Sequence, residues 1–131
     1  MQRIIDIVPY SVLPDHNGGQ KSIALFCKYL GKENKLLAIT TKNTDSGLAE
    51  NYEVKKFFST SKLRYINPAY FFSIKKMIKE FEAAHLITEH PYMAWMGWLL
   101  KKATGVKWSL RSHNIEYERF KSMGKWWWRM L

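Results

Sequence analysis

Short β-branched apolar runs alternate with longer stretches of helical periodicity, and this alternation is the feature that most constrains the fold. Strands separated by helices of about 10 to 15 residues are typical of βαβ units and a parallel sheet. The expected order is β-α-β-β-α-β-α-β-α, which predicts an α/β fold with a doubly wound, mainly parallel sheet. The expected strands cover residues 3–8, 35–40, 53–58, 85–89 and 106–111.

Four helices are expected between and after these strands. Gly31 is expected to end the first helix and Gly105 the third, because glycine suits the position after a helix. Asn67 and Pro68 suit a helix start as cap and first residue, and Pro91 is expected to open the next helix. No convincing helix separates the second strand from the third. The expected helices cover residues 20–31, 67–83, 91–104 and 115–131.

Composition limits the class of protein. The chain has 131 residues, 47% hydrophobic and 24% charged, which fits one globular domain and excludes a disordered chain or a coiled coil. No apolar run approaches a membrane span, and the first residues do not form a secretory signal. Cys27 is the only cysteine, so no internal disulfide can form, and a reducing, cytoplasmic location is expected.

The charge is strongly positive. Lysine and arginine number 21 against 11 acids, a formal net charge of +10, which predicts attraction to nucleic acid, anionic lipid or phosphorylated ligands. No acid lies between Glu53 and Glu80, and large aromatic residues are interleaved with the cations there. A membrane-surface role for this basic segment is slightly preferred to an ordinary solvated face. Stacking on single-stranded nucleic acid is the other alternative. The predicted membrane patch is Lys55, Lys56, Lys62, Arg64, Lys75, Lys76 and Lys79.

Candidate site residues follow the first strand. Ligands of open parallel sheets bind beyond the carboxyl ends of the strands, where the strand order reverses. His16 and the Gly18-Gly19 pair lie in the loop that leads into the first helix. The glycines allow a close backbone approach, and the helix start offers free N–H groups to a phosphate. A tight turn that needs glycine is the alternative. The loop lacks the GxGxxG and GxxxxGK[ST] patterns of dinucleotide-binding folds and P-loops.

Polar residues also follow the fourth and fifth strands. His90 would lie before a helix start, whose field favours the neutral imidazole that can accept a proton; capping of that helix is the alternative. After the fifth strand, helix capping accounts for Asn114 and Glu116. Arg111 and His113 are less easily explained by capping and could meet an anionic substrate, with a purely structural role as the alternative. Three histidine-bearing loops thus converge on one edge of the sheet. No metal-ligand spacing occurs, Cys27 is expected in the core, and His85 is expected to be structural.

Together these residues resemble a known family. The Pro-rich loop ending in Gly18-Gly19, Thr40-Thr41, LITEHP at 86–91 and WSLRSHNIE at 108–116 are similar, in order and spacing, to the N-terminal half of family-4-type retaining glycosyltransferases with the GT-B fold. The resemblance implies a Rossmann-like domain and transfer of a sugar from a nucleotide sugar to a glycan or lipid-linked acceptor.

The resemblance also implies residue roles. Gly18 and Gly19 would lie by the donor diphosphate, and His90 would face the reacting sugar. His16, Arg111 and His113 would lie on the substrate side, the last two lining the acceptor cleft. No cofactor or metal is expected, because the nucleotide sugar is a co-substrate. The N-terminal domains of such enzymes often touch the membrane, which would place the protein in the cytoplasm, peripheral on the inner face of the membrane.

One departure from the family pattern bears on activity. The family has a second domain that supplies most nucleotide-sugar contacts, with an E-x7-E pattern that this sequence lacks. Residues 1–131 are therefore expected to form an incomplete N-terminal domain, inactive without its C-terminal partner domain. The alternative function is a basic module that binds nucleic acid or a membrane surface without catalysis. No nucleic-acid motif supports that alternative, so nucleic acid is not an expected partner.

Overall fold

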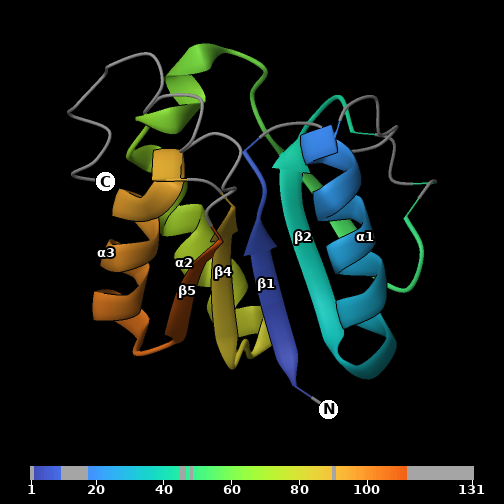
Figure 1. Cartoon of the computed structure of the whole chain (residues 1–131). Coiled ribbons are helices and arrows are strands. Elements are labelled where there is room, and N and C mark those ends of the chain that lie inside the picture. Colours follow the sequence, from blue (N-terminus) through green and yellow to red (C-terminus); the bar gives the residue numbers. More distant parts are fainter. Residues whose placement is uncertain (1, 10–17, 45–46, 48, 90, 112–131) are drawn as a thin grey trace, which may run out of the picture.

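Five parallel strands form a single sheet in the order β3-β2-β1-β4-β5 (Figure 1). The computed structural model describes residues 2–9, 18–44, 47, 49–89 and 91–111. The parallel sheet confirms the fold class expected from the sequence, because every pairing between neighbouring strands is parallel. The strands are β1 (Arg3–Ile7), β2 (Lys35–Thr41), β3 (Glu53–Phe58), β4 (His85–Glu89) and β5 (Lys107–Arg111).

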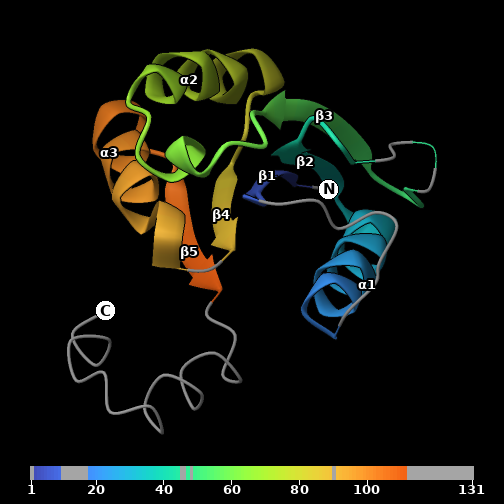
Figure 2. The same cartoon turned by 90° about the horizontal axis from the view of Figure 1, so that it is seen from above.

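Helices cover both faces of the sheet. Helix α1 lies on one face, and α2 and α3 lie on the other (Figure 2), which makes the sheet doubly wound. Two short 3-10 helices, η2 and η3, precede α2 and α3 respectively. The bounds are α1 (Gly18–Glu33), η2 (Lys62–Tyr65), α2 (Ala69–Phe81), η3 (Pro91–Met93) and α3 (Ala94–Thr104).

The strand order reverses between β1 and β4. β1 pairs with β2 on one side and with β4 on the other, so that Ile5 lies between Leu37 and Leu86. The chain moves outward from β1 to β2 and β3, then returns across the sheet to β4 and β5. The crevice that ligands use in such sheets therefore lies at the carboxyl ends of β1 and β4, as expected.

Two apolar cores follow from the side-chain alternation of the strands. Ile5 and Ile7 pack in the core beneath α2 and α3, whereas Ile4 and Val8 pack in the core beneath α1. Strands buried on both faces need apolar residues at nearly every position, which explains Ile4, Ile5, Ile7 and Val8. Asp6, fully buried among them, is the exception.

Several helix boundaries differ from the sequence prediction. Gly31 does not end α1, which begins at Gly18 and continues to Glu33; a Cβ at Gly31 would collide with the carbonyl oxygen of Asn51, so close packing explains this glycine. Pro68 precedes α2 instead of opening it, although Asn67 Oδ1 does accept the Ala69 N–H at 3.0 Å.

The observed ends of α2 and α3 also agree with the sequence prediction only in part. Helix α2 stops at Phe81 because Glu82 adopts the left-handed conformation (φ 56°). Pro91 opens the 3-10 turn η3, and α3 starts only at Ala94. Gly105 (φ 74°) ends α3 as predicted. The helix expected over residues 115–131 lies outside the described residues.

Gly97 allows α3 to sit directly on β4 and β5. A Cβ at Gly97 would collide with the indole of Trp108, whose Nε1–H donates to Thr88 Oγ1 at 3.0 Å.

We expect Gly97→Val to lower the free energy of unfolding by about 1–3 kcal/mol, because overpacking forces side chains from their rotamers. Ala103→Val, on the exposed side of α3, should lower the free energy of unfolding by about 0.6 kcal/mol or less. Denaturant unfolding measures both, and equal losses would contradict the packing argument.

Candidate functional site

The candidate site lies at the edge of the sheet where β1, β4 and β5 end. The first turn of α1 lies at the same edge (Figure 1). Gly18 and Gly19 form that first turn, and Arg111 is the last residue of β5. The structure therefore brings these three predicted residues to one edge of the sheet. His16, His90 and His113 lie outside the described residues, so their roles stay predictions.

A buried ion pair joins the ends of β4 and β5. Glu89 and Arg111, the last residues of their strands, are register partners, and Arg111 Nη1 lies 2.8 Å from Glu89 Oε1. The Glu89 side chain is fully buried, whereas 28% of the Arg111 side chain is exposed. The guanidinium carbon lies 3.7 Å from the centre of the Phe26 ring on α1. Arg111 is thus held from two sides, and Glu89 offsets its charge.

Asp6 extends this contact into the core. It is fully buried on β1 and accepts a hydrogen bond from Cys27 Sγ–H at 3.5 Å. Burial raises the pKa of Asp6 well above 3.8, and the charge and hydrogen bond of Glu89 raise it further. The Cys27 hydrogen bond and the Arg111 charge lower it, with smaller effects. Asp6, Cys27, Glu89 and Arg111 are called the buried polar cluster below.

Cys27 is a core residue, as the sequence predicted. It is buried, and burial together with the neighbouring Asp6 raises the pKa of its thiol far above the ordinary value. A thiol held protonated is a poor nucleophile. His85 also fits its expected structural role, because its Nε2 lies 2.8 Å from Ser109 Oγ on the neighbouring strand, at the opposite edge from the candidate site.

Sequence reasoning missed Asp6 and Glu89 as members of the site. Each carried a signal, because each is an acid in an otherwise apolar, buried strand. A buried carboxylate needs a partner, so two such acids on strands expected to be neighbours predict a shared contact. Their pairing could not be found without the register, which aligns Asp6 with Ile87 and so places Glu89 two residues farther along β4.

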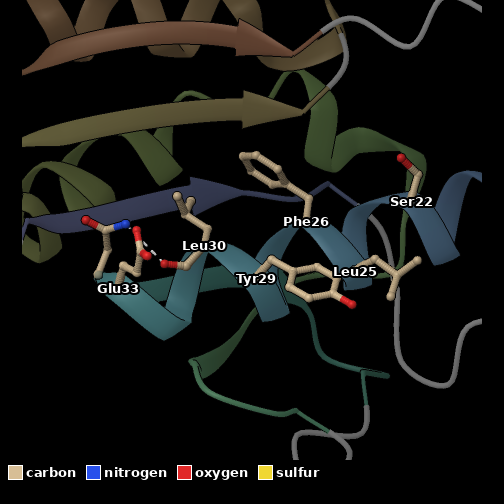
Figure 3. A pocket seen from close by; sticks show the side chains of 7 residues that line it. Ser22, Leu25, Phe26, Tyr29, Leu30 and Glu33 are labelled. Atoms are coloured by element: carbon tan, nitrogen blue, oxygen red, sulfur yellow. Dashed lines mark hydrogen bonds between the residues drawn. The ribbon is translucent and has the colours of Figure 1, made fainter.

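A shallow groove of about 470 Å³ runs along the flank of α1 (Figure 3). The groove lies beside the buried polar cluster, because Phe26, whose ring Arg111 covers, forms part of its wall. Its lining comes from α1 and from Asn34 directly after it, and not from the strand ends. Within the part of the chain described, no three His, Cys, Asp or Glu residues lie close enough to hold a metal ion. The groove residues are Ser22, Leu25, Phe26, Tyr29, Leu30, Glu33 and Asn34.

The predicted membrane patch divides into different environments. Lys55 and Lys56 are exposed on the edge strand β3, Lys76 and Lys79 are exposed on α2, and Lys75 is half-buried. The side chain of Lys62 is not described. Three large apolar side chains are exposed in the same segment, and of these the sequence analysis expected Phe72 as one of the interleaved aromatic residues. They are Leu63 (66% exposed), Ile66 (69%) and Phe72 (71%).

Arg64 forms hydrogen bonds within the protein that connect η2 to the residues after β1. Its guanidinium donates to the carbonyl oxygens of Pro9 at 2.5 Å, Thr60 at 3.0 Å and Ser61 at 2.9 Å, and to the Tyr65 hydroxyl at 2.8 Å. The loop after β1 is therefore tied to η2. Trp95 Nε1–H donates to the Tyr65 carbonyl oxygen at 2.8 Å, which ties η2 to α3 in turn. No helix among the described residues has the length and apolar character needed to cross a bilayer.

Comparison with known proteins gives the fold a context. No family model and no curated protein sequence matches the chain. Sucrose-phosphate synthase from Thermosynechococcus elongatus is similar over 92% of this chain and 35% of its own, with a TM-score of 0.68 and 14% identity. A glycosyltransferase from Rickettsia africae is similar over 83% of this chain and 29% of its own, with a TM-score of 0.58 and 22% identity.

The chain has a glycosyltransferase-like fold. Both matches cover most of the chain, and the parallel sheet with its helix layers agrees with them. The chain spans about a third of the length of these proteins. At identities of 14% and 22% the likeness establishes the fold, and the activity of this protein is a separate question.

The buried Asp6 should leave a signature in the pH dependence of stability. Its folded-state pKa is raised, so the stability contributed by its proton is complete below about pH 4 and is lost as pH rises through the folded pKa. In Asp6→Asn this titration is absent, and we expect the free energy of unfolding to fall less steeply with rising pH. Urea unfolding at a series of pH values measures the slope. Glu53→Gln, an exposed acid on β3, is the control; a wild-type slope in Asp6→Asn would contradict the assignment.

Proposed function

We propose that this chain is the acceptor-side, N-terminal domain of a glycosyltransferase of the family-4 retaining type with the GT-B fold. The whole enzyme would transfer a sugar from a nucleotide sugar to a glycan or lipid-linked acceptor. The observation that carries the proposal is the β3-β2-β1-β4-β5 sheet, similar to sucrose-phosphate synthase over 92% of this chain, with polar strand ends at its crevice.

The edge of the sheet suits this chemistry. Gly18 and Gly19 open the 16-residue helix α1, whose free N–H groups and positive end favour a diphosphate. His90 follows Glu89 at the end of β4, where a neutral imidazole could accept the proton of an attacking hydroxyl. His16 and His113 would contribute to substrate binding from their loops. The proposal requires no metal ion and no further cofactor.

Arg111 would act differently from a free cation in this site. Its charge is offset by Glu89 at 2.8 Å and its guanidinium face is covered by Phe26. An anion approaching Arg111 must compete with a buried carboxylate. The proposed contribution of Arg111 to the acceptor cleft is therefore hydrogen bonding from its remaining N–H groups, and not a full positive charge.

A second domain would complete the site. The chain spans only 35% and 29% of the two similar proteins, and we propose that a C-terminal domain supplies most contacts to the nucleotide sugar. The 131-residue chain alone would then show no transferase activity, and assays belong on the natural gene product.

The test of the proposal is nucleotide release from a panel of nucleotide sugars by the natural gene product. We expect one or more donors to be turned over, and His90→Ala to lower kcat by about 10²-fold or more, as loss of a general base does. His85→Ala, at the opposite edge of the sheet, is the matched control and should keep near-wild-type kcat. Turnover of no nucleotide sugar, or full activity of His90→Ala, would contradict the proposal.

We also propose that the basic segment rests on the anionic inner face of a membrane, with the protein otherwise in the cytoplasm. Phe72, Lys76 and Lys79 are all exposed on α2, and the exposed Leu63 and Ile66 lie in the adjoining stretch of chain. Cations beside protruding apolar side chains suit anionic headgroups above a hydrocarbon layer. Glu80, 3.8 Å from Lys76 Nζ, is the one acid within α2 itself.

Vesicle binding tests the membrane proposal with a closely matched pair of variants. Phe72→Ser/Lys76→Glu/Lys79→Glu should weaken binding to vesicles containing anionic phospholipid by about tenfold or more, since each lysine near the surface contributes about 1 kcal/mol. The control is Trp98→Ser/Lys101→Glu/Lys102→Glu on α3, which removes an exposed aromatic ring and two exposed lysines elsewhere. Equal losses of vesicle binding in both variants would show nonspecific charge attraction and contradict the membrane proposal.

A further inference from the structure

Three members of the buried polar cluster, Asp6, Cys27 and Glu89, have no task in the function proposed above. Four different elements contribute to the cluster: Asp6 from β1, Cys27 from α1, Glu89 from β4 and Arg111 from β5. Asp6 and Glu89 are fully buried, and Cys27 is nearly so. Natural cores seldom retain two buried carboxyl groups, because each costs desolvation that apolar residues avoid. The position of this cluster, directly beneath the candidate site, requires an explanation.

The ion pair of the cluster is its best-defined contact. Arg111 Nη1 lies 2.8 Å from Glu89 Oε1, and the Glu89 side chain is fully buried. Removing either partner of such a pair leaves the other as an uncompensated buried charge. Among the described residues Asp6 Oδ1 has no hydrogen-bond partner, which disfavours ionised Asp6.

We propose that Glu89 is a positioning residue of the candidate site: its buried ion pair with Arg111 fixes the carboxyl ends of β4 and β5 against each other. Glu89 is the residue directly before His90 in the sequence, and Arg111 is the last residue of β5. The Phe26 ring beneath the guanidinium extends this connection to α1. The proposal rests on the proposed function only in that these strand ends serve sugar transfer.

A purely structural role predicts a different result from a positioning role. Replacing a buried ion pair by residues that leave no orphaned charge is often neutral for stability, whereas removing one partner is costly. A variant that changes both Glu89 and Arg111 should therefore recover stability. If the pair also positions the site, the recovered fold will still lack activity.

The experiment that tests the proposal measures kcat, the donor KM and the melting temperature of Glu89 and Arg111 variants of the natural gene product. We expect Glu89→Gln and Arg111→Met each to lower kcat by about tenfold to hundredfold, as misplacement of reacting groups does, with the donor KM changed less than about threefold. Arg111→Lys, which keeps a cation for Glu89, should retain more kcat than Arg111→Met. In Glu89→Gln/Arg111→Met the melting temperature should recover towards the wild-type value, while kcat stays as low as in the single variants.

The outcomes separate the two proposals. Recovery of kcat together with melting temperature in the double variant would reduce the pair to a structural element and overturn the positioning role. Wild-type kcat in Glu89→Gln would do the same. A wild-type enzyme that turns over no nucleotide sugar would overturn the proposed function instead. The melting temperatures of the single and double variants would then decide whether the ion pair between Glu89 and Arg111 exists.

Discussion

The backbone pairing of β1 on both of its sides is the constraint on which the rest of the structure depends. A strand in the middle of a parallel sheet must be buried on both faces, so helices are required above and below it. Right-handed crossovers then place α1 on one face and α2 and α3 on the other. The strand order reverses between β1 and β4, so no connecting segment crosses over the carboxyl ends of these two strands. The candidate site is thus a consequence of where the chain turns back.

Much of this could be predicted from sequence because burial on both faces leaves a strong pattern. All five strands fall where the sequence predicted them, although β3 and β5 are more exposed than β1, β2 and β4. The α/β class follows from the alternation of strands with helices. Helix ends were less predictable. Gly31 suggested a helix end, yet it lies inside α1 because Asn51, a residue distant in sequence, packs against it. A glycine needed for close approach and a glycine needed for a turn look the same in one sequence.

The candidate site was predicted in part, for a related reason. Gly18, Gly19 and Arg111 follow or end expected elements, so topology alone brought them to one edge. Asp6 lies inside β1 and Glu89 is the last residue of β4, and in both strands sequence patterns give apolar burial the greater weight. Their contact depends on the register of β1 against β4, which no local signal specifies. The role of Arg64 was hidden likewise, because its hydrogen bond to Pro9 joins residues 55 positions apart.

Charge is distributed unevenly between the interior and the surface, and this distribution bears on how the site could work. The chain carries a net charge of +10, yet the one arginine at the described strand ends is balanced by a buried acid. Long-range attraction of anions would come from exposed lysines, whereas the crevice itself would offer directed N–H groups with little net charge. Such a division permits fast encounter with a polyanionic surface or a phosphorylated substrate without trapping the anion at Arg111. It follows that the affinity and the placement of a substrate would be set by different residues, with Glu89 governing placement through Arg111 and the end of β4.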